Sequence, residues 1–239
     1  MAGKMHPYGA LLLSVQLLAA CSDGQPRQET GDNRIAVANR IDAPSAIGSP
    51  EQADERLVLA FGDSLYAGYG LRPNESFPHD LEQALEASGV RARVVNAGVS
   101  GDTTAAGLQR LAFTLDGLPR KPDLALVGLG GNDMLRGIDP ATTRANLDSI
   151  LSELRRREIP VMLTGMLAAP NLGPDYGARF NAIYRDLARK HGAVLDPFFL
   201  DVVITEQKLM QEDGIHPNAE GIDRIVRRVA PMVAAELKS

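Results

Sequence analysis

The chain has 239 residues, of which 44% are hydrophobic, so it can bury one sizeable core or at most two small ones. Its formal net charge is −5, its Lys and Arg residues are spread along the sequence, and it contains no tryptophan. Without a basic patch or a set of aromatic stacking residues, nucleic acid is excluded as an expected partner.

The first 21 residues have the pattern of an export signal. Lys4 precedes an apolar run from Ala10 to Ala20, which is shorter than the roughly 20 residues that a spanning helix needs. The run ends in Leu-Ala-Ala-Cys, and small residues before a cysteine resemble the lipobox of bacterial lipoproteins. That resemblance implies a lipid on Cys21, the only cysteine of the chain, and a location on the periplasmic face of a bacterial membrane. Ser22 favours the outer membrane, and an ordinary secretory signal with Cys21 unmodified is the alternative.

Residues 22–55 differ in composition from the rest of the chain. They include three prolines and many small polar residues, with no aromatic residue and no leucine. Such a segment cannot bury enough apolar surface to offset the entropy lost on ordering. We therefore expect a flexible tether at 22–55 and one folded domain at 56–239.

Within this domain, five short apolar runs alternate with helical patterns. The runs are bounded by Gly, Pro or Asp, as expected for strands buried on both faces, and they cover 57–61, 93–97, 123–130, 159–166 and 193–198. This alternation predicts an α/β fold, a doubly wound parallel sheet of five strands with helices on both faces.

Two of the helices show clear boundary signals. Asp139-Pro140 is typical of a helix start, and an apolar stripe follows at Leu147, Ile150, Leu151 and Leu154. The last helix is expected to begin at Pro217, with one face formed by Ile222, Ile225, Val226, Val229 and either Met232 or Val233.

The polar clusters that could carry chemistry all follow strands. Ser64 follows the first strand, Ser100-Gly101-Asp102 the second, and Gly130-Gly131-Asn132-Asp133 the third, while Asp213 and His216 come after the fifth. Ligands of parallel α/β sheets bind at the carboxyl ends of the strands, so these clusters are expected at one common edge.

A reactive serine needs a neighbouring base, which is usually histidine. Of the four histidines, His6 lies in the signal segment, His79 is expected at the surface, and His191 precedes Gly192 at a helix end. His216 remains, and Asp213 three residues earlier can turn back to orient its imidazole, as the third member of a catalytic triad does. The alternative for His216 is a turn residue before the last helix.

A tetrahedral intermediate also requires hydrogen-bond donors for its oxyanion. Asn132 is a candidate side-chain donor, and Gly101 is a candidate backbone donor because it lacks a Cβ. Asn132 could instead only cap the turn after its strand. Asp63 is expected to be structural, with its carboxylate turned away from the target of Ser64.

Four sequence blocks resemble the signature blocks of the SGNH (GDSL) hydrolases: GDSL at 62–65, NAGVSGDT at 96–103, GGND at 130–133 and DGIHPN at 213–218. The strings are most similar to the bacterial periplasmic thioesterase, arylesterase and lysophospholipase group. The resemblance covers residues 57–239 and implies a flavodoxin-like fold. It further implies Ser64 as nucleophile, His216 as base, Asp213 as its orienter, and an oxyanion hole made by the N–H groups of Ser64 and Gly101 and the Asn132 amide.

The resulting expectation is a lipid-tethered serine esterase for acyl esters or thioesters, working without metal or cofactor. No P-loop or H-E-x-x-H motif occurs in the sequence. Met134, Leu135 and Ile138 could form an apolar wall for the acyl chain, or could pack under the following helix. The alternatives are a carbohydrate or peptidoglycan O-acetyl esterase and a non-catalytic binding lipoprotein.

Overall fold

The computed structural model describes residues 55–238. The predicted signal segment with Cys21, and all of the predicted tether except its last residue, lie outside the described residues. The described part is an α/β unit whose first strand begins at Arg56.

Five parallel strands form one sheet in the order β2-β1-β3-β4-β5. Their bounds are β1 Arg56–Gly62, β2 Ala92–Gly98, β3 Leu124–Gly128, β4 Val161–Thr164 and β5 Val194–Asp196. β1 lies between β2 and β3, and its side chains are buried from Leu57 onward, as its continuous apolar run predicts. At the carboxyl end, Gly62 of β1 pairs with Gly98 of β2 and Gly128 of β3, so these three strands end level with one another.

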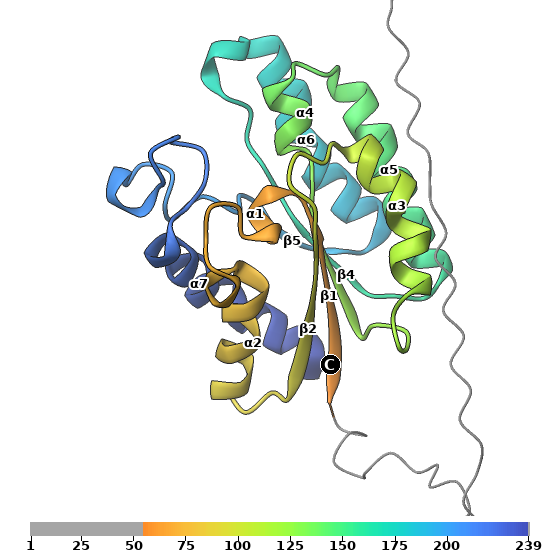
Figure 1. Ribbon diagram of the computed structural model, residues 1–239. Coiled ribbons are helices and arrows are strands. Elements are labelled where there is room, and N and C mark those ends of the chain that lie inside the picture. The colour runs from red at the N-terminus through yellow and green to blue at the C-terminus, as the bar shows by residue number, and fades with distance from the viewer. Residues whose placement is uncertain (1–54, 239) are drawn as a thin grey trace, which may run out of the picture. The chain divides into compact units, whose positions relative to one another are not determined.

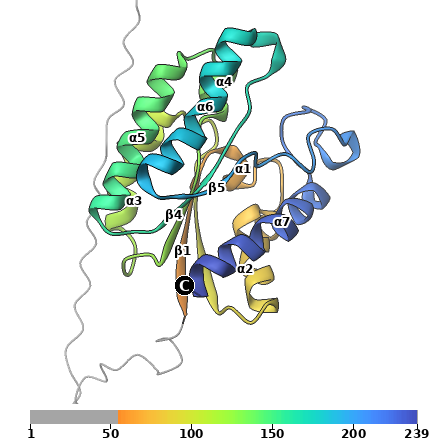
Figure 2. The same ribbon diagram turned by 180° about the vertical axis from the view of Figure 1, so that it is seen from behind.

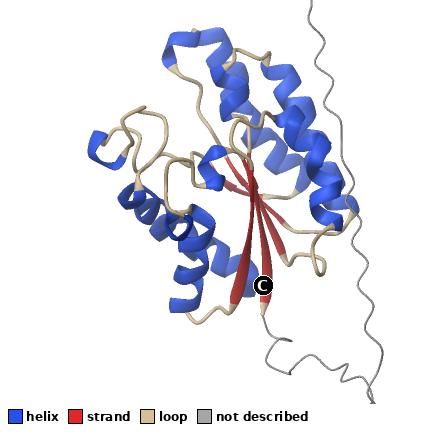
Figure 3. Ribbon diagram, in the orientation of Figure 1, coloured by secondary structure: helices blue, strands red, loops and turns tan. Residues whose placement is uncertain are grey.

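Helices cover both faces of the sheet, which confirms the predicted doubly wound fold (Figures 1 and 2). On one side lie α2 (Phe77–Ala87) and α7 (Ala219–Lys238), and on the other lie α3 (Thr104–Asp116), α5 (Pro140–Arg156) and α6 (Pro174–His191). Figure 3 shows the strands as a layer between these two groups. The short helices are α1 (Ser64–Ala67), α4 (Gly131–Leu135) and the 3-10 segments η2 (Pro73–Glu75), η3 (Pro170–Leu172) and η4 (Gln207–Leu209).

The start of α5 follows the predicted capping pattern. The Asp139 carboxylate accepts a hydrogen bond from the Ala141 N–H at 2.8 Å, and Pro140 occupies the first helical position. The predicted apolar stripe of this helix, Leu147, Ile150, Leu151 and Leu154, is fully buried.

Two expectations about elements need correction. β2 is an edge strand in which exposed side chains such as Arg93 alternate with buried ones such as Val94, so it is not buried on both faces. The last helix begins at Ala219 rather than at Pro217, because Pro217 forms a β-bridge with Met210. The Asn218 side chain then accepts a hydrogen bond from the Gly221 N–H at 3.0 Å in the first turn.

Among residues 55–238, no helix combines the length and the apolar character that crossing a bilayer requires.

Candidate active site

Ser64 lies two residues beyond the end of β1, as the first residue of α1. Asp63 caps this short helix by accepting a hydrogen bond from the Leu65 N–H at 3.1 Å. Tyr66, a residue of the same helix, has a buried side chain whose hydroxyl hydrogen-bonds Thr164 Oγ1 at 2.9 Å. A Cβ at Gly62 or at Gly128 would lie 2.5 Å from the ring of Tyr66, so both glycines make room for the side chain that fixes α1.

Ser64, His216 and Asp213 form one hydrogen-bonded chain. His216 Nε2 is 2.9 Å from Ser64 Oγ, and His216 Nδ1 is 2.6 Å from Asp213 Oδ2. The ring of Tyr69 packs against the imidazole with its centroid 4.6 Å away. The two residues after β5 thus meet the serine after β1, although they lie about 150 positions later in the chain.

Hydrogen bonds keep the Asp213 carboxylate charged. Its Oδ1 accepts from the backbone N–H groups of Ile215 at 2.9 Å and His216 at 3.0 Å. Desolvation opposes ionisation, but these bonds and the bond from the His216 ring outweigh it and lower the pKa of Asp213 to about 2. An ionised carboxylate only accepts hydrogen bonds, so the proton lies on Nδ1 and Nε2 is free to accept from the Ser64 hydroxyl.

The residues predicted to bind an oxyanion come from three loops. Gly101 lies between β2 and α3 with φ of +85°, a conformation that favours glycine. Asn132 lies in the first turn of α4 after β3. None of the hydrogen bonds in the described part of the chain uses the backbone N–H of Ser64 or of Gly101, so both N–H groups are available as donors.

Asp63 differs in environment from Asp213. Its side chain is buried, and Asn132 Nδ2 approaches its Oδ2 to 3.4 Å. Burial raises the pKa of Asp63 to about 6, against the opposing effects of the Leu65 N–H, the charge of His216 and the Asn132 amide. The carboxylate has the expected structural role as the cap of α1, and it also contacts the predicted oxyanion donor, which was not expected.

An apolar cavity of about 460 Å³ opens beside Ser64 and His216, a volume typical of small-molecule sites. Of the predicted wall residues, Met134 and Leu135 line it. Ile138 does not line it. Its carbonyl accepts a hydrogen bond from the Tyr176 hydroxyl at 3.0 Å, and its N–H bonds to the carbonyl of Asp133 at 2.9 Å. The backbone of Ile138 is therefore hydrogen-bonded in the turn before α5, and Ile138 is not part of the apolar wall.

Three further segments of the lining were missed from sequence. They are 166–170 after β4, 198–204 after β5, and Ile215 beside His216. The apolar run of β4 continues past the strand as Met-Leu-Ala-Ala-Pro, and this excess of apolar residues in a loop is a signal that could have indicated the segment.

The other histidines lie away from this site. His79 is exposed on α2. His191 ends α6, as expected, with its Nε2 2.6 Å from Asp148 Oδ1.

Comparison with known proteins supports the same chemistry. The model of the GDSL-like lipase/acylhydrolase family matches residues 60–224. Esterase TesA of Pseudomonas aeruginosa is 40% identical over 181 residues, which cover 76% of this chain and 89% of that protein. Arylesterase of Vibrio mimicus is 39% identical over 191 residues, which cover 80% of this chain and 94% of that protein. The solved structure of AlinE4, an SGNH-hydrolase family esterase, is 55% identical with a TM-score of 0.66 and covers 76% of this chain and 96% of its own.

The fold and these relatives define a class, the serine hydrolases that act on carboxylic ester or thioester bonds. Within that class, the chain belongs to the GDSL-like lipase/acylhydrolase family.

Proposed function

We propose that the protein hydrolyses acyl esters or thioesters with Ser64 as nucleophile, His216 as general base and acid, and Asp213 as the carboxylate that orients His216. The observation that carries this proposal is the continuous hydrogen-bonded chain from Ser64 through His216 to Asp213 at the mouth of an apolar cavity. Each contact has the length that proton transfer through a positioned base requires.

In the first step, Ser64 Oγ attacks the acyl carbonyl carbon while His216 Nε2 takes the hydroxyl proton. The imidazolium that forms is stabilised by the ionised Asp213. The carbonyl oxygen becomes an oxyanion, and it is bound by the N–H groups of Ser64 and Gly101 and by the Asn132 amide. One N–H of that amide faces Asp63, which leaves the other for the oxyanion.

The intermediate collapses when the bond to the leaving group breaks and His216 donates its proton to the departing oxygen or sulfur. Water then attacks the acyl carbon while His216 Nε2 takes its proton, the bond between that carbon and Ser64 Oγ breaks, His216 returns the proton to Ser64 Oγ, and the acid is released. The cycle requires no redox change, and every proton passes through His216 Nε2.

The cavity supports an acyl chain as the group held during this cycle. Met134 and Leu135 of α4 and Ile215 beside His216 are apolar residues of the same lining as Ser64. The relative named thioesterase 1/protease 1/lysophospholipase L1 from Escherichia coli, 37% identical over 185 residues, adds thioesters and lysophospholipids to the candidate substrates.

Hydrolysis of p-nitrophenyl esters from acetate to dodecanoate tests the proposal on the purified protein. We expect Ser64→Ala to lower kcat by at least about 10³-fold, because the nucleophile is removed. Ser149→Ala is the matched control, since Ser149 is exposed on α5 and bonds only the Ala145 carbonyl of its own helix. Turnover by Ser64→Ala at the wild-type rate would contradict the proposal.

The chain-length profile separates the remaining candidates. Activity on medium and long acyl esters supports an acyl esterase or thioesterase. Activity confined to acetyl groups on glycans would favour an O-acetyl esterase, and inactivity on every ester and glycan would favour a binding protein.

For location, we propose that the protein is exported and anchored by a lipid on Cys21 to the periplasmic face of a bacterial membrane. The support is the pattern Leu-Ala-Ala-Cys after an apolar run. Mass spectrometry of the mature protein tests this, with a lipid-modified Cys21 at the N-terminus expected. An unmodified N-terminus at another residue would contradict it.

A further inference from the structure

The three proposed oxyanion donors belong to separate loops, so something must hold those loops at a fixed spacing. The loop of Gly101 is exposed, and its own backbone bonds are few. The Val99 N–H donates to the Gly62 carbonyl at 3.0 Å, and the Asp102 N–H donates to the Val99 carbonyl at 3.1 Å. The exposed Arg136 also reaches the Gly101 carbonyl at 2.8 Å, but exposed contacts contribute little to rigidity.

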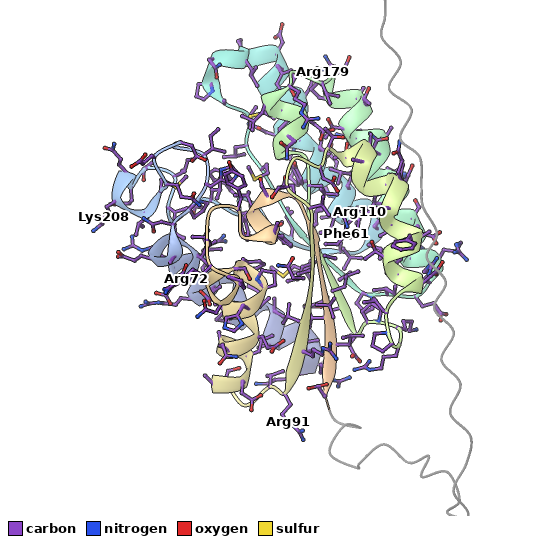
Figure 4. The ribbon with its side chains drawn as sticks, viewed as in Figure 1. Phe61, Arg72, Arg91, Arg110, Arg179 and Lys208 are labelled. Carbon is purple, nitrogen blue, oxygen red and sulfur yellow. The ribbon has the colours of Figure 1, made fainter. Side chains whose placement is uncertain are left out.

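One side chain outside the four signature blocks joins this loop to the end of β1, the strand that precedes Ser64. Arg110 Nε donates to Asp102 Oδ2 at 2.6 Å, and its Nη2 donates to the Gly62 carbonyl at 2.9 Å. The guanidinium lies 4.1 Å from the centroid of the Phe61 ring, and Figure 4 labels these two residues side by side. The Arg110 and Asp102 side chains are only 20% and 12% exposed.

The two residues that Arg110 joins, Gly62 and Asp102, lie within two positions of proposed oxyanion donors in the sequence. Gly62 precedes Ser64 by two residues, and Asp102 directly follows Gly101. A guanidinium presents its donors in a rigid planar fork, so engaging both partners fixes the distance between them. Stacking on Phe61 fixes the plane of the fork, and partial burial strengthens its charged bonds.

Arg110 and the third loop are connected through the same helix. Arg110 lies on α3, and the first residue of α3, Thr104, bonds the buried Asp133 beside Asn132 through its N–H at 2.8 Å and its hydroxyl at 2.5 Å. The helix therefore contacts the loops of Gly101 and Asn132, and through Arg110 it contacts the end of β1, two residues before Ser64.

We propose that Arg110 is a positioning residue for the oxyanion hole, which holds the Gly101 N–H where it and the Ser64 N–H reach the same oxygen. This inference rests on the proposed function. It predicts an effect on the transition state rather than on ground-state binding, because Arg110 is not among the residues that line the cavity.

The test is Arg110→Met in the full chain, which keeps much of the side chain's packing and removes both bonds. A displaced oxyanion donor lowers kcat by about 10- to 100-fold, with KM unchanged within about threefold. The inhibition constant of an alkyl boronic acid, which forms a tetrahedral adduct with a reactive serine, rises by a similar factor. Asp102→Ala removes the acceptor of one bond and retains the Gly62 bond, so it is expected to show a smaller loss, which provides a second arm if Arg110→Met does not fold.

Arg157→Met is the matched control. Arg157 is 24% exposed, and it bonds Asp116 at 2.5 Å and Glu153 at 2.7 Å. None of these three residues lines the cavity beside Ser64. A merely structural role predicts that both arginine variants lose thermal stability and keep the wild-type kcat at temperatures where they are folded. A folded Arg110→Met or Asp102→Ala with wild-type kcat and boronic acid affinity overturns the inference.

Ser64→Ala measured in parallel separates this outcome from failure of the proposed function. If Ser64→Ala remains active, the proposed site is wrong and the inference falls with it. If Ser64→Ala is inactive while folded Arg110→Met is normal, only the role of Arg110 is wrong.

Discussion

Two aspartates beside the same serine have opposite electrostatic environments. Asp213 receives hydrogen bonds from two backbone N–H groups and a histidine ring, and these lower its pKa to about 2. Asp63 is enclosed, and desolvation raises its pKa to about 6. The hydrogen bonds to Asp213 therefore keep its carboxylate charged beside His216. Burial of Asp63 next to α1 instead favours its neutral form.

Asp213→Asn tests whether the negative charge of Asp213 assists His216. An amide cannot stabilise an imidazolium and can stabilise the wrong tautomer, so we expect kcat to fall by about 10³- to 10⁴-fold. Glu212→Gln, one residue earlier and exposed, is the control and should leave the rate within about twofold. The measurement is kcat on a p-nitrophenyl ester, and a rate near that of the wild type would show that Asp213 does not assist His216.

Asp63→Asn tests the raised pKa of Asp63 through the pH dependence of the free energy of unfolding. The folded pKa of about 6 lies above the ordinary aspartate value of 3.8, so the folded state holds an extra proton between those two pH values. Its contribution to stability is complete below about pH 4 and is lost as the pH rises through about 6. Asp63→Asn removes this dependence. The wild type should lose up to about 3 kcal/mol relative to the variant between pH 4 and pH 8, measured by denaturant unfolding. Parallel pH curves for the two proteins would contradict the assignment.

At the scale of elements, α1 is fixed between the level ends of β1, β2 and β3. Glycine at these ends permits close contact, because a Cβ at Gly98 would lie 2.2 Å from the backbone nitrogen of Ala67. A backbone atom cannot move aside as a flexible side chain can. The nucleophile is therefore positioned by strand ends that only glycine satisfies.

Gly98→Ala is expected to destabilise the protein by about 1 to 3 kcal/mol and to lower kcat, because α1 must shift. Gly177→Ala is the control. Gly177 lies within α6 with no heavy atom within 4 Å of the added Cβ, so alanine there should stabilise by about 0.5 to 1 kcal/mol. Denaturant unfolding measures both. If Gly98→Ala were as stable as the wild type, this account of α1 would be wrong.

The strands and the Asp213–His216 pair could be predicted from sequence because their signals are local, whereas Ser64, 152 positions from His216, could be joined to that pair only because four sequence blocks resemble those of one family. β1 is a continuous apolar run, and Asp213 lies within one turn of His216. The contacts of Ile138 and Arg110 could not be predicted, because they depend on residues 38 and 48 positions away. α7 begins two residues later than its sequence predicts, because Pro217, a residue type common at helix starts, is held in a bridge to Met210.

At the scale of the whole molecule, loops after four different strands converge on one cavity. Four exposed aliphatic side chains stand around it, Leu135, Leu167, Ile204 and Ile215, each at least 41% exposed. Exposed apolar side chains gathered at a cavity are typical of a site that binds an apolar ligand. From this arrangement we expect a preference for substrates with an extended acyl chain.

Leu135→Asp tests that preference. Each methylene that leaves water contributes about 0.8 kcal/mol, so the loss in kcat/KM should be about tenfold or more for a long acyl ester and small for acetate. Phe113→Asp is the control, since Phe113 is 84% exposed on α3 and does not line the cavity. Equal losses on short and long esters would show that Leu135 does not contact the acyl chain.

Covalent labelling tests the central claim most directly. The purified protein is treated with an alkyl fluorophosphonate, which modifies activated serines, and the modified peptide is identified by mass spectrometry. We expect one adduct, on Ser64, with loss of ester hydrolysis in proportion to labelling and no labelling of His216→Ala. An adduct on another serine that accompanies the loss of activity, or full activity after Ser64 is modified, would contradict the assignment of Ser64 as the nucleophile.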